Sequence, residues 1–118
     1  MTAIVADDSK YYREVISSIL NKNGVTIVGL VDNGLDAVNE ALNQKPDIIV
    51  MDITMPEMDG LQALQRIYSR DKSIKVIICT SMDSSNLTVE AIQRGAKGFV
   101  LKHYLPDSLL DALERIIA

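Results

Sequence analysis

Five short apolar runs alternate with longer stretches of mixed polarity along the chain. The runs cover residues 3–6, 25–30, 48–51, 76–79 and 98–101. Three of them are continuously apolar rather than alternating, which is typical of strands that are buried on both faces of a parallel sheet. β-branched residues, which favour strands, dominate the runs. The pattern therefore predicts five strands in a buried sheet.

Between the runs, apolar residues recur every three or four positions, which is the spacing of an amphipathic helix. The recurring residues, one helix after another, are Tyr11, Tyr12, Val15, Ile16, Ile19 and Leu20; Leu35, Val38, Ala41 and Leu42; Leu61, Leu64, Ile67 and Tyr68; Leu87, Ala91 and Ile92; and Leu109, Leu110, Leu113, Ile116 and Ile117. Ser9 is the expected N-cap of the first helix, and Asn33 precedes the second. The third helix begins after Asp59-Gly60. Gly95 closes the fourth helix, and Pro106 lies near the first turn of the fifth.

Strand and helix thus alternate five times along the chain. This order indicates an α/β fold, a doubly wound five-stranded parallel sheet with helices on both faces. No linker, repeat or low-complexity segment divides the chain, so we expect one domain over residues 1–118. Ligands of such sheets bind beyond the carboxyl ends of the strands, where the winding reverses. The residues that end each strand are therefore the candidates for function.

Polar and charged residues stand at four of those strand ends. They are Asp7-Asp8 after the first strand, Asp52 after the third, Thr80-Ser81 after the fourth and Lys102 after the fifth. Taken singly, each has an ordinary explanation, since a carboxylate after a strand is usually a helix cap and a lysine there is usually solvated. Because the fold brings these ends to one edge of the sheet, three carboxylates, a hydroxyl and an ammonium would converge there.

Three carboxylates at one edge would repel one another unless a hard divalent cation lies among them. Mg²⁺ prefers oxygen ligands and commonly binds through one or two carboxylates and a phosphate. The lysine and the hydroxyl would then be partners for the remaining phosphate oxygens. This set of groups indicates phosphoryl transfer to an aspartate. Asp52 stands alone after the central buried strand and is the candidate nucleophile, whereas the Asp7-Asp8 pair is better suited to holding the metal.

The whole chain resembles the receiver domain of two-component response regulators. The resemblance is carried by residues 4–9 and 46–60, Thr80-Ser81, Gly95-Ala96 and residues 98–102. Each motif alone is modest, but their order and separations are highly specific. The resemblance implies a flavodoxin-like, CheY-like (βα)5 fold. It also implies a phosphorylatable signalling switch of a two-component system, such as that of chemotaxis, which assists its own phosphorylation and dephosphorylation but is not otherwise an enzyme.

The family's site residues can be carried over to the matching positions of this chain. Asp52 resembles the phosphoacceptor. Asp8 and Asp52, with the backbone carbonyl of Thr54, resemble the Mg²⁺ ligands, and Asp7 would reach the metal through water. Lys102 resembles the lysine that contacts the phosphoryl group.

Two further positions resemble the family's switch residues. Thr80 resembles the hydroxyl that moves toward the phosphate, and Phe99 occupies the aromatic position on the fifth strand. Phe99 lacks the phenolic hydroxyl of some members, so its switching would depend on rotamer and packing, and plain core filling is the alternative. The resemblance implies a sensor histidine kinase as a partner. It also implies a downstream effector protein that binds the fourth helix, the fifth strand and the fifth helix.

The chain departs from the family pattern near the site. His103 follows Lys102 where many receivers have proline, and Met82 and Thr54 occupy variable positions that flank the path of attacking water. A cis bond before a residue other than proline costs roughly 3 to 4 kcal/mol. We therefore expect a trans Lys102–His103 bond, with the lysine still reaching the pocket on its flexible four-carbon stem.

Composition narrows the classes of partner. Apolar residues make up 47% of the chain and charged residues 24%, which excludes disordered and collagen-like classes. The net charge of −4 makes direct binding to nucleic acid or to an anionic membrane a poor fit. No targeting segment or membrane-spanning stretch is visible, so a cytoplasmic location is expected. Cys79, the single cysteine, lies in an apolar run and is interpreted as a buried, inert thiol.

Particular residues favour or disfavour the other interpretations of the sequence. The chain ends directly after the fifth helix, so it is either a stand-alone receiver or a receiver cut from a longer DNA-binding response regulator. An aspartyl-phosphate phosphatase would need a second aspartate two residues after the nucleophile, where this chain has Thr54. A flavodoxin-like cofactor binder would need a phosphate-binding loop where Asp7-Asp8 stands. A receiver-like domain that is never phosphorylated is disfavoured by the intact set Asp8, Asp52, Thr80 and Lys102.

Overall fold

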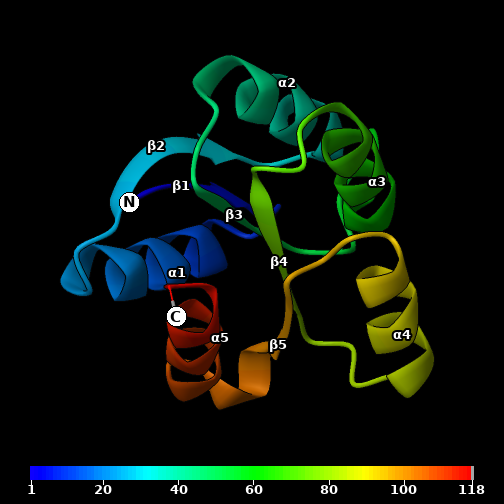
Figure 1. Cartoon of the computed structure of the whole chain (residues 1–118). Coiled ribbons are helices and arrows are strands. Elements are labelled where there is room, and N and C mark those ends of the chain that lie inside the picture. Colours follow the sequence, from blue (N-terminus) through cyan, green and yellow to red (C-terminus); the bar gives the residue numbers. More distant parts are fainter. Residues whose placement is uncertain (118) are drawn as a thin grey trace.

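The computed structural model describes residues 1–117 and contains the predicted alternation of strands and helices (Figure 1). The strands are β1 (Thr2–Ala6), β2 (Thr26–Val31), β3 (Ile48–Met51), β4 (Lys75–Thr80) and β5 (Gly98–Leu101). The helices are α1 (Lys10–Lys22), α2 (Gly34–Gln44), α3 (Gly60–Arg70), α4 (Ser85–Gln93) and α5 (Asp107–Ile117), with a 3-10 turn, η1 (Lys102–Tyr104), between β5 and α5. The strand bounds differ from the apolar runs by one residue at most, and η1 is the element that the apolar pattern does not predict.

All five strands are parallel and lie in the order β2-β1-β3-β4-β5, which confirms the doubly wound sheet. The winding reverses between β1 and β3, because the chain first moves outward to β2 and then returns across β1. Ala6 and Met51, the last residues of β1 and β3, are register partners. The Asp52 N–H continues this pairing by donating to the Ala6 carbonyl oxygen at 2.9 Å. The reversal point therefore lies where the candidate carboxylates stand.

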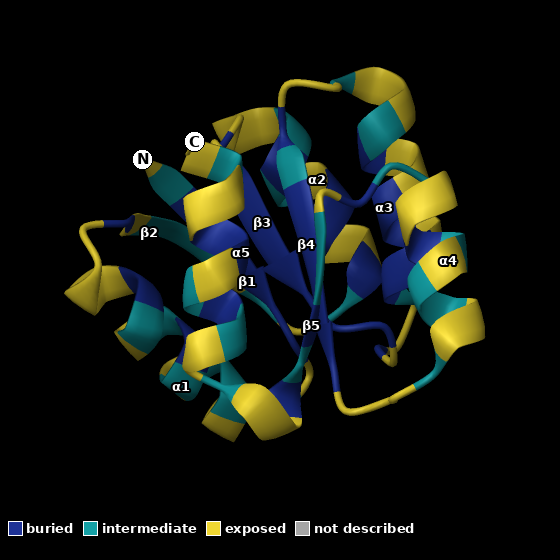
Figure 2. Cartoon of the chain, turned by 60° about the horizontal axis from the view of Figure 1, so that its bottom comes forward, coloured by how far each residue is buried: buried dark blue, intermediate teal, exposed yellow. Residues whose placement is uncertain are grey.

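The sheet separates two apolar cores (Figure 2). Helices α2, α3 and α4 cover one face, and α1 and α5 cover the other (Figure 1). Along β3, Ile49 and Met51 point into the first core, whereas Ile48 and Val50 point into the second. Because both faces of β3 are covered, this strand is apolar at every position rather than at every second one.

Helices α1, α2 and α3 begin at or within one residue of the predicted starts, and α4 ends just before Gly95, as predicted. The side chains of Ser9, Asn33 and Asp59 each accept a hydrogen bond from a backbone N–H three residues further on. Gly95 follows α4 with a φ of +111°, which favours glycine. A Cβ at Gly95 would also come within 2.5 Å of the Tyr68 ring. The turn from α4 into β5 therefore requires glycine.

Four residues of the predicted apolar stripes are exposed instead of buried. Tyr11 is 66%, Leu35 43%, Ile92 50% and Ile117 67% exposed. All four lie in the first or last turn of a helix. Helix α4 packs on the edge strand β5, which covers only a narrow stripe, and Ala91 is its buried residue. The helical pattern thus identified the helices correctly but was wrong about the burial of these positions.

Two expectations from composition can be compared with the fold. Cys79 is fully buried, and burial raises the pKa of its thiol to about 12, so the thiol stays protonated and inert near neutral pH. Across residues 1–117, no helix has the length and the apolar content that crossing a membrane requires.

Candidate functional site

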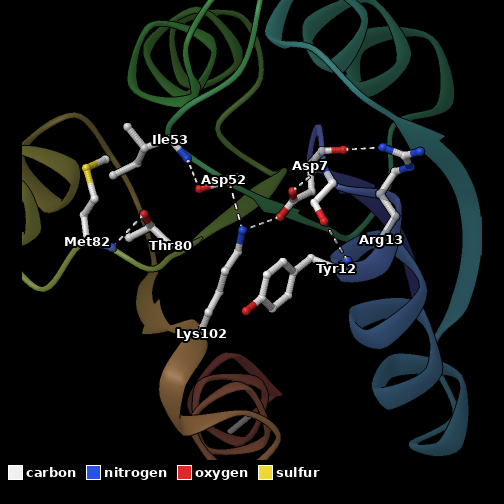
Figure 3. A network of polar contacts seen from close by, with 9 residues as sticks. Asp7, Tyr12, Arg13, Asp52, Ile53, Thr80, Met82 and Lys102 are labelled. Atoms are coloured by element: carbon white, nitrogen blue, oxygen red, sulfur yellow. Dashed lines mark hydrogen bonds and ion pairs between the residues drawn. The ribbon is translucent and has the colours of Figure 1, made fainter.

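Four polar or charged side chains are buried within residues 1–117, and all four stand at the carboxyl ends of strands. They are Asp7, Asp52, Thr80 and Lys102. Figure 3 shows them converging from β1, β3, β4 and the start of η1. Asp8 is exposed beside them. Burying charge is costly unless it is compensated, so its concentration at one edge marks this edge as the candidate site.

The Lys102 ammonium joins the two buried aspartates. Its Nζ atom lies 2.8 Å from Asp7 Oδ2 and 2.9 Å from Asp52 Oδ2, and the lysine side chain is only 6% exposed. The prediction that this lysine reaches the pocket is therefore confirmed. Within residues 1–117 the one cis peptide bond is Leu105–Pro106, so the Lys102–His103 bond is trans, as predicted.

Burial and charge act on these groups in opposite directions. Burial raises the pKa of Asp7 above its usual value and the charge of Asp52 adds to the rise, whereas Lys102 and the Ser9 N–H oppose it. For Lys102, burial alone would lower the pKa, but the bonds to the two aspartates outweigh burial and raise it. Lys102 is therefore a firmly held cation, while the negative charge of Asp7 is destabilised by its surroundings.

Three carboxylates at this edge could hold a metal ion. One oxygen from each of Asp7, Asp8 and Asp52 can be chosen so that the three atoms lie within 4.8 Å of one another. The three carboxylates outnumber the single Lys102 ammonium, so the cluster carries excess negative charge. Asp7 Oδ2 is buried and accepts no well-formed hydrogen bond, even though Lys102 Nζ is near. An all-oxygen donor set with excess negative charge fits a hard divalent cation, and the Thr54 carbonyl stays a predicted ligand.

The turn after β3 fixes the Asp52 carboxylate. Its Oδ1 atom accepts a hydrogen bond from the Ile53 N–H at 2.7 Å, while Oδ2 faces Lys102. The turn folds back so that the Gly60 N–H donates to the Ile53 carbonyl oxygen at 2.7 Å. A Cβ at Gly60 would lie 1.9 Å from the Asp52 carbonyl oxygen, so this close approach requires glycine. Asp52 is consequently held rigidly and is 8% exposed.

The Thr80 hydroxyl is engaged with the loop after β4. Its Oγ1 atom accepts a hydrogen bond from the Met82 N–H at 3.2 Å (Figure 3). On the neighbouring strand, Phe99 is partly buried and packs against the core beneath α2, α3 and α4. The two candidate switch residues thus lie on paired strands, with Ile78 opposite Phe99 and Thr80 opposite Leu101.

Two contacts at the site involve residues that the sequence pattern does not single out. Arg13 Nη1 donates to the Asp7 carbonyl oxygen at 2.7 Å, and the Tyr12 ring centroid lies 4.1 Å from Lys102 Nζ. The sequence pattern assigns Tyr12 only to the apolar face of the first helix. Helical spacing indicates a face, whereas the contact with Lys102 depends on a residue at the far end of the sequence. No local signal identifies it.

The chain is similar in sequence to known proteins over almost its whole length. Residues 3–114 match the family model described as response regulator receiver domain. The chain is 43% identical over 112 residues to the chemotaxis protein CheY of Listeria monocytogenes, which covers 95% of this chain and 94% of that protein. It is 39% identical over 114 residues to the chemotaxis protein CheY of Bacillus subtilis, covering 97% and 95% of the two chains.

Solved structures show the same fold. A chain of the CheX-CheY-BeF3-Mg²⁺ complex from Borrelia burgdorferi superposes with a TM-score of 0.95 at 28% identity, covering 100% of this chain and 90% of that one. A DNA-binding response regulator of the LuxR family from Staphylococcus aureus gives a TM-score of 0.92 at 28% identity, with 99% and 98% covered. The fold is therefore shared by regulators with different outputs.

Proposed function

Because this chain belongs to the response regulator receiver domain family, we propose that its Asp52 carboxylate accepts a phosphoryl group from a sensor histidine kinase. The family consists of signalling domains, and we take residues 1–118 as one such domain, acting in the cytoplasm as a switch rather than as a classical enzyme. The observation that carries the proposal is the burial of Asp52 beside Lys102 and Asp7 at the sheet edge. A desolvated carboxylate next to a fixed cation is suited to accept an electrophilic phosphoryl group.

Mg²⁺ is the proposed cofactor. Asp8, Asp52 and the backbone carbonyl of Thr54 would hold it directly, and Asp7 would contact it through water. The clustering of the three carboxylates, whose negative charge exceeds the positive charge of the single Lys102 ammonium, supports this assignment. When bound, Mg²⁺ would neutralise the negative charge of the transferred group, for which the single Lys102 ammonium is insufficient.

Few groups of the protein would take part in the phosphoryl transfer. An oxygen of Asp52 forms the bond to phosphorus while the phosphorus–nitrogen bond of the kinase phosphohistidine breaks and the histidine nitrogen keeps the electron pair. Lys102 Nζ, released from the modified carboxylate, then contacts a phosphoryl oxygen. Attack of water on phosphorus later breaks the new bond and restores Asp52. Met82 and Thr54 are both exposed beside this position, and we expect them to influence the phosphoryl lifetime.

The switch would act through Thr80 and Phe99. The Thr80 hydroxyl would leave the Met82 N–H and donate to a phosphoryl oxygen, which opens space for a rotamer change of Phe99. The face affected is that of α4, β5 and α5, which we propose as the binding surface of a downstream effector protein. Val89 and Ile92 on α4 are 54% and 50% exposed, and this apolar surface supports a protein partner.

The alternative contexts are not better supported. A receiver within a longer DNA-binding regulator would use the same site, as the similarity to the Staphylococcus aureus regulator illustrates. An aspartyl-phosphate phosphatase is disfavoured, because Thr54 is no general acid. Chemotaxis is the proposed pathway, given the similarity to CheY proteins over nearly their whole length. With a net charge of −4, the chain is not expected to bind nucleic acid or membranes directly.

Intact-mass spectrometry with acetyl phosphate as phosphoryl donor tests the proposal. We expect the wild-type chain to gain the mass of one phosphoryl group in the presence of Mg²⁺ and not in the presence of a chelator. The variant Asp52→Ala should lose the gain, whereas Asp59→Ala, which alters an aspartate in the same turn, should keep it. An unchanged yield in Asp52→Ala would overturn the assignment.

A further inference from the structure

An aromatic ring borders the Lys102 ammonium on the side that faces α1. The centroid of the Tyr12 ring lies 4.1 Å from Lys102 Nζ, and Figure 3 shows the ring alongside the lysine side chain. The two carboxylates that Lys102 contacts, Asp7 and Asp52, belong to the ends of β1 and β3. A cation held within about 6 Å of a ring centroid is attracted by the electron-rich face of the ring, and more strongly where water is excluded.

We propose that Tyr12 is a positioning residue for Lys102, its ring forming the third wall of the ammonium site. This inference rests on the proposed role of Lys102 as the cation that contacts the phosphoryl group. Two of the three N–H groups of the ammonium can face Asp7 and Asp52, and the ring covers a further side. The ammonium is therefore held between the strand ends by charge on two sides and by the ring on another.

The ring is fixed relative to Asp7 by the first turn of α1. The Ser9 hydroxyl accepts a hydrogen bond from the Tyr12 N–H at 3.4 Å, and Asp7 Oδ1 accepts one from the Ser9 N–H at 2.9 Å. The Arg13 guanidinium donates to the Asp7 carbonyl oxygen at 2.7 Å. Behind Tyr12, the Tyr11 ring packs edge-on at a centroid distance of 5.1 Å and an interplanar angle of 79°. The start of the helix therefore sets the place of the ring.

Lys102 opens the short turn η1, and the next two residues, His103 and Tyr104, are exposed. A lysine stem has four flexible carbons and loses considerable rotamer freedom when its end is fixed. The ring of Tyr12 contributes to that ordering, and the ring takes no part in the covalent reaction. When Asp52 is modified, the ring still keeps the ammonium at the position from which it contacts the phosphoryl oxygens.

The first test needs no variant and no phosphoryl group. In the NMR spectrum of the metal-free chain, the ring current of Tyr12 should shift the ε-methylene protons of Lys102 upfield. An exposed lysine such as Lys45, whose ammonium pairs with Asp71, provides the reference; Lys72 does not, because it lies 5.1 Å from the Tyr68 ring. The shift should persist in Tyr12→Phe and vanish in Tyr12→Leu. A wild-type Lys102 signal at the reference position would overturn the inference.

The second test uses beryllofluoride with Mg²⁺ as the phosphoryl mimic, titrated against the amide signals of Ile53 and Thr80. Tyr12→Leu should weaken its binding about tenfold, an effect within the range of a desolvated cation–ring contact. Tyr12→Phe should bind like the wild type, because it keeps the aromatic ring. Urea unfolding of each variant separates loss of fold from loss of positioning, with Tyr12→Met as the substitute if Tyr12→Leu does not fold.

The outcomes separate the inference from the function on which it rests. Equal affinity of wild type and Tyr12→Leu would overturn the positioning role. A wild-type chain that fails to bind beryllofluoride at all would overturn the proposed function, while the ring-current measurement would still decide where Tyr12 holds Lys102.

Discussion

A charged pair is exposed to water at one edge of the sheet, whereas charged side chains are buried at the other edge. At the edge where the strands begin, Lys45 Nζ lies 3.5 Å from Asp71 Oδ2, and the Lys45 side chain is 68% exposed. At the edge where the strands end, Lys102 lies between Asp7 and Asp52 and is almost fully buried. Both edges pair a lysine with aspartate, but only the second removes the pair from water.

The pKa values of Asp71 and Asp7 move in opposite directions, and the causes differ. Hydrogen bonds from the Ser73 side chain and backbone lower the pKa of Asp71, because they stabilise its charged form. Burial raises the pKa of Asp7, because it destabilises that form. Replacing buried ion pairs with apolar residues is often neutral or stabilising, so the second edge is not explained by stability. Stability is therefore given up at the edge for which we propose a Mg²⁺ and phosphoryl site.

Removing the lysine from each edge should give the largest contrast. Lys102→Met leaves two buried carboxylates without their cation and should lower the free energy of unfolding by about 3 kcal/mol at neutral pH. Lys45→Met removes a solvated charge and should lower it far less. Urea unfolding in the presence of a chelator measures both. Similar losses in the two variants would break the distinction between the edges.

Magnesium should stabilise the chain through the buried edge alone. At a free Mg²⁺ concentration one hundred times the dissociation constant, mass action predicts a gain of about 2.7 kcal/mol in the free energy of unfolding. Asp8→Asn should lose most of this gain, since it removes a carboxylate from the cluster. Asp71→Asn, at the opposite edge, should retain it. Urea unfolding with and without Mg²⁺ measures the gain in each variant. Equal gains in Asp8→Asn and Asp71→Asn would mean that the ion binds elsewhere.

The charge of Asp7 should make the metal-free chain less stable as the pH rises. Because the pKa of Asp7 is raised in the folded state, its contribution is fully present below the usual value of 3.8 and is lost as the pH rises through the folded-state pKa. Asp7→Asn removes this loss and should stabilise the chelated protein by about 1 kcal/mol at neutral pH. When the free energy of unfolding is measured from pH 3.8 upward, the values of the two proteins should agree at the acidic end and diverge as the pH rises. If Asp7→Asn were less stable than the wild type at neutral pH, the negative charge of Asp7 would be fully compensated by its partners, which would contradict the prediction.

Asp71 should give the smallest effect, with the opposite sign. Its pKa is lowered in the folded state, so its contribution is present above the usual value of 3.8 and is lost as the pH falls through the folded-state pKa. Asp71→Asn should therefore be slightly less stable than the wild type at neutral pH, and the free energies of unfolding of the two proteins should converge as the pH falls below 3.8. Equal stability of the two proteins at neutral pH would contradict the role of Ser73.

The main features of the site were predictable, because they depend on topology. Apolar runs predict strands, alternation predicts a parallel sheet, and parallel strands bring their carboxyl ends to one edge. Asp52 and Lys102 are far apart in sequence, yet this reasoning places them together, and their Oδ2 and Nζ atoms lie 2.9 Å apart.

Features that depend on side-chain packing were not predictable. Helical spacing puts Tyr12 and Ile92 on apolar faces, but the first contacts the Lys102 ammonium and the second is half exposed. Their surroundings are set by partners distant in sequence, Lys102 for one and the edge strand β5 for the other. The engagement of the Thr80 hydroxyl with the Met82 N–H is likewise a property of loop geometry rather than of sequence pattern.

The most direct measurement locates the phosphoryl group on the chain. Borohydride reduction converts an aspartyl phosphate to homoserine, and tandem mass spectrometry of the digested protein then identifies the modified position. After phosphorylation with acetyl phosphate and Mg²⁺, we expect homoserine at Asp52 and at neither Asp7 nor Asp8. Homoserine at another aspartate, with Asp52 unmodified, would show that Asp52 is not the phosphoacceptor.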